Sequence, residues 1–126
     1  MVSKIIKEKI IQYIQVYGGC TSNDLIESLG MYSPQIYNGL CELVKEERIQ
    51  KFKITFNRGR HLGQHYVFTN IKRQYNWYFY YTDKKRFLKW FAKQINPNIS
   101  DFGLVAMFHK KLSTKEIDII INYRKP

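Results

Sequence analysis

The stretch that decides the fold is SPQIYNGLCELVKEERI, residues 33–49. Serine followed by proline is typical of a helix start. The serine hydroxyl can cap free amides at the helix start. Proline is tolerated at the first helical position, because the N–H that it lacks would have no partner within the helix there. Apolar residues then recur at helical spacing, which predicts one buried stripe made of Ile36, Leu40, Leu43 and Val44. The segment therefore predicts an amphipathic helix.

Two more helices are predicted upstream of it. Residues 3–17 carry apolar side chains at helical spacing, namely Ile6, Ile10, Tyr13, Ile14 and Tyr17. Gly18-Gly19 ends this helix, and Thr21 to Asp24 forms a capping-box start in which Asp24 replaces the usual glutamate. Gly30 is placed to close the second helix, whose apolar face contains Leu25, Ile26 and Leu29.

A basic hairpin is predicted downstream. Residues 49–56 alternate, with Phe52, Ile54 and Phe56 on one face and Lys51, Lys53 and Thr55 on the other. A basic loop with two glycines follows at residues 57–64, and residues 65–69 predict a second strand. The two strands would pair across this loop.

This order of elements resembles that of winged-helix transcriptional regulators over about residues 3–70. Residues 33–49 resemble their recognition-helix region, with a polar start, apolar residues at Ile36, Leu40 and Leu43, and Ile49 opening the wing. The pattern departs at Glu47, where such proteins commonly have glycine. The resemblance implies an α+β, mainly helical fold: a winged helix-turn-helix with a two- or three-stranded β-wing and a C-terminal helical extension.

The extension is expected to span residues 71–126 and to pack on a first domain at 1–70. Residues 71–81 are aromatic and basic and favour an extended conformation. Helices are predicted at 83–95 after Thr82, from Ser100 to Leu112, and from Thr114 to Tyr123 after a capping box that runs from Ser113 to Glu116. The last two helices suit a dimerisation hairpin, with packing on the first domain or a second helix-turn-helix as alternatives.

The charge of the chain favours a polyanionic partner. Its formal net charge is +11, and each cation placed near a phosphate can release a condensed counterion. Residues 1–70 hold 9 basic and 6 acidic residues, whereas residues 71–126 hold 12 and 4. The second half therefore contributes most of the attraction.

The composition also predicts a soluble, intracellular protein. Two cysteines without framework spacing suit a reducing compartment. Met1–Lys9 lacks the pattern of a signal peptide, and no stretch reaches the roughly 18 apolar residues of a membrane span.

The outward face of the third helix carries the candidate base contacts. Gln35 and Asn38 belong to the residue types that bind adenine bidentately, and Tyr37 can reach a phosphate or a thymine methyl group. Gly39 would leave room for close approach, whereas Glu42 would repel phosphates. This helix would therefore supply specificity rather than affinity, with contacts from Ser33, Gln35, Tyr37, Asn38 and Lys45.

Affinity is expected from two other groups of cations. The wing would follow a phosphate backbone, or place an arginine in the minor groove, through Lys51, Lys53, Arg58, Arg60 and His61. The C-terminal half would contact the DNA backbone through Lys72, Arg73, Lys84, Lys85 and Lys89. Aromatic residues between these cations, such as Trp77, could stack on unpaired bases but are better explained as core.

Metal binding and catalysis are not expected. Cys20 and Cys41 are not a close pair, and His61 and His65 straddle a glycine-containing loop. No phosphate-cradling loop, matched nucleophile and base, or carboxylate cluster occurs. We therefore expect no enzyme, no cofactor, no metal and no small-molecule ligand.

The sequence predicts a sequence-specific double-stranded DNA-binding protein. The simplest form is a transcriptional regulator, of viral or plasmid origin given its size, acting as a homodimer on a two-fold site. The alternatives are a replication or partition factor, a binder of RNA or single-stranded nucleic acid, and a winged helix that binds protein.

Overall fold

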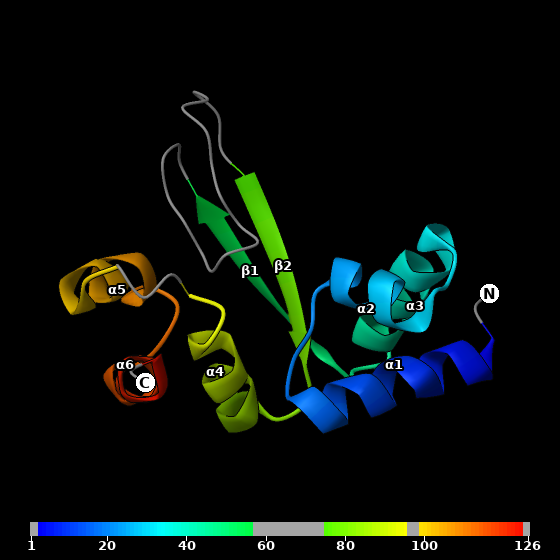
Figure 1. Ribbon diagram of the computed structural model, residues 1–126, viewed down its shortest axis with the longest axis horizontal. Coiled ribbons are helices and arrows are strands. Elements are labelled where there is room, and N and C mark those ends of the chain that lie inside the picture. Colours follow the sequence, from blue (N-terminus) through cyan, green and yellow to red (C-terminus); the bar gives the residue numbers. More distant parts are fainter. Residues whose placement is uncertain (1–2, 57–74, 96–98, 125–126) are drawn as a thin grey trace. The chain divides into compact units, whose positions relative to one another are not determined.

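The computed structural model describes residues 3–56, 75–95 and 99–124. Within these ranges the chain is mainly helical, with six helices and a sheet of two antiparallel strands (Figure 1). It divides into two compact units. The first comprises Met1–Ile54 and Asn76–Lys84, and the second includes Lys85–Pro126.

The first unit begins with three helices, α1 (Lys4–Tyr17), α2 (Ser22–Leu29) and α3 (Ser33–Lys45). The predicted capping box of α2 is confirmed, because the Thr21 hydroxyl accepts from the Asp24 amide at 3.2 Å and the Asp24 carboxylate accepts from the Thr21 amide at 2.9 Å. Gly18 and Gly30 end α1 and α2 in the left-handed conformation, as their positions predict. Local capping chemistry thus sets these boundaries.

The two ends of α3 differ from expectation in instructive ways. Ser33 does not cap the helix, because Tyr32 is the N-cap residue and Ser33 already lies in the first turn beside Pro34. At the other end of α3, Glu47 has a φ angle of 61°. It is the only non-glycine residue with positive φ in the described part of the chain. The Glu47 amide donates to Val44 O and the Arg48 amide to Leu43 O, both at 3.0 Å. Glu47 therefore adopts the conformation for which glycine is usual.

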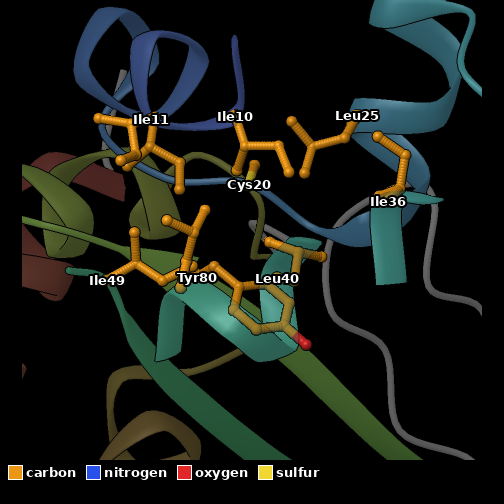
Figure 2. Packing of buried hydrophobic residues seen from close by; sticks show 10 residues of the cluster. Ile10, Ile11, Cys20, Leu25, Ile36, Leu40, Ile49 and Tyr80 are labelled. Carbon is orange, nitrogen blue, oxygen red and sulfur yellow. The ribbon is translucent and has the colours of Figure 1, made fainter. Parts of the chain in front are cut away.

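A single hydrophobic cluster holds the three helices together (Figure 2). Both α1 and α2 pack on α3. Gly39 is buried on the same face of α3 as the apolar stripe, so it does not face outward, as the predicted close approach to a ligand would require. The fully buried members of the cluster are Ile10, Ile14, Cys20, Leu25, Ile36, Leu40 and Leu43.

The sheet pairs β1 (Gln50–Phe56) with β2 (Tyr75–Tyr81). Ile54 is buried while Lys51 and Lys53 are exposed, which confirms the predicted alternation for these side chains. The predicted loop at 57–64 and strand at 65–69 lie outside the described residues. Within the described residues, the strand that pairs with β1 is the aromatic run, which the sequence placed in the C-terminal extension.

The first unit takes up β2 because the strand completes its core. Tyr80 belongs to the hydrophobic cluster of the helices. Its backbone also forms an antiparallel bridge with Cys20, in the segment between α1 and α2. The aromatic strand therefore buries side chains and satisfies backbone groups in the same place.

The second unit contains most of α4 (Lys84–Ala92), together with α5 (Asp101–Phe108) and α6 (Thr114–Arg124). Ser100 caps α5 by accepting from the Gly103 amide at 3.0 Å, and Ser113 and Glu116 form the predicted capping box. Both α4 and α5 end earlier than predicted. None of the helices in the described ranges has the length and apolar character needed to cross a membrane.

Aromatic stacking and one arginine hold this second unit together. The Phe91 ring stacks on Phe87 and meets Phe108 edge-on, with centroids 5.5 and 5.6 Å apart. Arg124, near the end of α6, binds the Asp101 carboxylate at 2.6 Å and also donates to the backbone oxygen of Ile99. These bonds tie the C-terminal end of α6 to the start of α5, which packs against it.

Candidate nucleic-acid interface

The outward face of α3 carries the predicted base-contacting residues. Because helical residues advance by about 100°, the side of α3 opposite the buried stripe faces solvent. Tyr37 is 48% exposed. The other exposed side chains on this side are Gln35, Asn38, Cys41 and Lys45. The third helix therefore presents a polar, nearly uncharged surface.

Part of this surface forms one wall of a shallow groove between α1 and α3. The groove has a volume of about 530 Å³. It brings together three predicted site residues, Gln35, Asn38 and Lys45. Its remaining lining consists of Ser3, Ile6, Cys41 and Glu42. The predicted contact residue Ser33, which is half-buried, is not among them.

Ion pairs that sequence reasoning missed join α1 to α3 and to the turn that follows it. Lys7 Nζ lies 2.5 Å from Glu46 Oε2 and 3.1 Å from Glu42 Oε1, and these two bonds raise the pKa of Lys7. Arg48 binds Glu8 at 2.9 Å and thereby lowers the pKa of the Glu8 carboxyl. Glu42 is therefore charge-compensated, which reduces the repulsion of phosphates expected from its sequence position.

Strand β2 contributes two tyrosines, Tyr78 and Tyr80, to the first unit. Burial raises the pKa of Tyr80 to about 12, with smaller effects from Cys41 and Cys20. Tyr78, two residues earlier, is on the same face of the strand and is 39% exposed. The Lys51 ammonium lies 5.2 Å from the centre of the Tyr78 ring, within cation–π range. An exposed cation and an aromatic ring are thus held together on the sheet.

The last residues of the aromatic run serve packing. Phe79 is fully buried and Tyr81 is 5% exposed. The Tyr81 hydroxyl donates to Gln50 Oε1 at 3.0 Å. The interpretation of these residues as core is supported for this strand, and Tyr78 is the exception. Because Tyr78 shares a strand face with the buried Tyr80, the sequence pattern alone gives no signal that distinguishes it.

The other predicted phosphate contacts fall into two groups. Lys84, at the end of the first unit, and Lys85, at the start of the second, are exposed. Lys89 is half-buried, with its ammonium 4.7 Å from the centre of the Tyr123 ring, so part of its bonding capacity is used within the second unit. The structure does not describe Arg58, Arg60, His61, Lys72 and Arg73.

The described residues contain no cluster of three or more His, Cys, Asp or Glu side chains that could hold a metal ion. Cys20 is buried and Cys41 is exposed, and neither forms a disulfide. His61 and His65 lie outside the described ranges.

Comparison with known proteins adds no relative. No family model, curated protein or solved structure matches the chain.

Proposed function

We propose that this chain is a sequence-specific double-stranded DNA-binding protein with a winged-helix domain, and that it acts as a transcriptional regulator. The observation that carries the proposal is the exposed polar face of α3, together with the exposed lysines Lys51 and Lys53 on the strand β1 that follows it in the chain. A helix that offers amides and hydroxyls suits base edges, and a neighbouring basic strand suits phosphates.

The order of elements in the first unit supports the winged-helix assignment. Helices α1, α2 and α3 are followed by the antiparallel strands β1 and β2. An isolated antiparallel bridge also joins Tyr80 on β2 to Cys20, between α1 and α2. This agrees with a helix-turn-helix flanked by a small sheet, in which α3 is the recognition helix.

The charge distribution supports DNA as the ligand. The net charge of +11 provides long-range attraction, while α3 itself contributes a single cation, Lys45. Contacts to phosphate therefore come from residues around α3, and contacts to bases come from α3. The dimeric state expected from the sequence is part of the same proposal, with the α5–α6 hairpin as its candidate element.

The test is a selection from random duplex oligonucleotides, followed by titration of the full chain with the selected duplex at several salt concentrations. We expect a defined consensus and a logarithm of affinity that falls linearly with the logarithm of salt. Asn38→Ala should reduce the preference for the consensus. Lys53→Ala and Arg60→Ala should weaken binding to every duplex by a similar factor.

The matched control is Lys9→Ala, because Lys9 lines a different groove, between α1 and α2. We expect it to leave both the affinity for duplex DNA and the preference for the consensus nearly unchanged. Selection of no duplex above competitor at about 100 mM salt would contradict the proposal. Tight binding of oligonucleotides that lack a complement, lost on Tyr78→Ala, would favour the single-strand alternative instead.

A further inference from the structure

Two of the hydrogen-bonding groups that α3 exposes are carboxamides. Gln35 and Asn38 each end in an amide, which offers a donor and an acceptor side by side. In the major groove, adenine offers the complementary pair, an acceptor at N7 and a donor at N6. Thymine adds a methyl group that packs against apolar or aromatic atoms. Tyr37, exposed next to Asn38, supplies such a ring.

The groups that would read G·C pairs are absent from this face or already occupied. Guanine is read chiefly by arginine or lysine, and cytosine by glutamate or aspartate. Helix α3 contains no arginine, and its single lysine, Lys45, lies in the last turn. Its single acidic residue, Glu42, accepts from Lys7 at 3.1 Å. The first two turns of α3 therefore contain none of the residue types that chiefly read guanine or cytosine.

We infer that α3 reads A·T base pairs in the major groove, with the amides of Gln35 and Asn38 on adenine and the Tyr37 ring against a thymine methyl group. This inference rests on the proposed function and adds the class of target sequence. Residues three apart on a helix are separated by about 4.5 Å along its axis, close to the roughly 3.4 Å between stacked bases of one strand. The two amides therefore address neighbouring A·T pairs.

The test uses base analogues in the selected duplex, each placed at one position at a time. Replacing adenine by 7-deazaadenine removes the N7 acceptor and leaves Watson–Crick pairing intact. We expect the affinity of the full chain to fall about five- to a hundred-fold at each of two neighbouring positions. The same exchange of guanine for 7-deazaguanine should change the affinity less than two-fold at every position within the footprint of α3.

Variants assign each position to a residue. With Asn38→Ala, 7-deazaadenine should no longer weaken binding at one of the two positions, and with Gln35→Ala at the other. Gln12→Ala is the control, because Gln12 is an exposed amide that lines the separate groove between α1 and α2. It should leave both sensitivities unchanged. Thermal denaturation of each variant checks that the fold is intact.

Uracil in place of thymine tests the ring of Tyr37. We expect this exchange to weaken binding at one position. The resulting preference for thymine over uracil should be retained by Tyr37→Phe and lost in Tyr37→Ala. Sensitivity to 7-deazaguanine without sensitivity to 7-deazaadenine would overturn the inference and leave DNA binding standing. So would a consensus of G·C pairs. Failure to select any duplex would instead remove the proposed function itself.

Discussion

Cys20 and Tyr80 exchange two backbone hydrogen bonds, from the Cys20 amide to the Tyr80 oxygen at 3.1 Å and from the Tyr80 amide to the Cys20 oxygen at 2.9 Å. The pair joins residues sixty positions apart in the sequence and draws β2 against the helices of the first unit. The Tyr80 side chain becomes part of the core as a result. The core against which α3 packs is therefore built from both halves of the chain.

Tyr80 should make the protein sensitive to alkaline pH. Its pKa is about 12 in the folded state, against 10 for an ordinary tyrosine. The unfolded chain therefore loses this proton first, so the stabilising contribution is complete below pH 10 and is lost as the pH rises towards 12. In urea denaturation at pH 9, 10 and 11, the free energy of unfolding of Tyr80→Phe should fall less with rising pH than that of the wild type.

The control is Tyr32→Phe, which removes a phenol that is 71% exposed. An identical decline in wild type and Tyr80→Phe would contradict the prediction.

Replacing Glu47 by glycine should stabilise the protein. Glu47 occupies the left-handed region at φ 61°, which costs residues with a Cβ atom about 1 kcal/mol or more. Glu47→Gly should raise the free energy of unfolding by about 1 kcal/mol, measured by urea denaturation. Glu47→Ala removes the same charge but keeps the Cβ atom, so it should give no comparable gain. Equal stabilisation by both variants would show that the charge, and not the backbone conformation, is responsible.

The ion pair between Glu8 and Arg48 should contribute stability that acid removes. Arg48 lowers the pKa of Glu8 in the folded state below its ordinary value of 4.5. The contribution is therefore present above pH 4.5 and is lost as the pH falls through the lowered folded value. A double-mutant cycle with Glu8→Gln and Arg48→Gln should show favourable coupling at pH 7 and none in strong acid. Both side chains are substantially exposed, so added salt should weaken the coupling. Coupling that persists unchanged in acid would rule out the carboxylate as its source.

The features that local chemistry controls could be predicted from the sequence. Thr21 with Asp24, and Ser113 with Glu116, form capping boxes within four residues, so no distant part of the chain is needed to place those helix starts. The outward position of Gln35 and Asn38 follows from helical geometry once Ile36 and Leu40 are assigned to the core. Ser33 shows the limit of this reasoning. The Ser-Pro pattern suggests Ser33 as the N-cap residue of α3, whereas the N-cap residue is Tyr32, one position earlier.

The features that depend on distant residues could not be predicted in the same way. A run such as Tyr75–Tyr81 has strong strand propensity but nothing that specifies its partner, so its pairing with β1 and its bridge to Cys20 were missed. Lys7 could reach several carboxylates, and only the packing of α1 on α3 selects Glu42 and Glu46. Both features shape the first unit, because one packs Tyr80 against the helices and the other compensates the charge of Glu42.

The two cysteines should report on the candidate interface directly. Cys20 is fully buried, and burial raises the pKa of its thiol, whereas Cys41 is exposed on the outward face of α3. Because the thiolate is the reactive form, a disulfide reagent should modify Cys41 rapidly in the folded protein and Cys20 only after unfolding. If α3 lies in the major groove, saturating duplex DNA should slow the modification of Cys41 by about ten-fold or more, because a specific interface covers the protein surface that it contacts. The control is Cys41→Ser, which should abolish the rapid phase. A duplex that binds tightly yet leaves the reaction rate of Cys41 unchanged would place DNA on another surface of the protein.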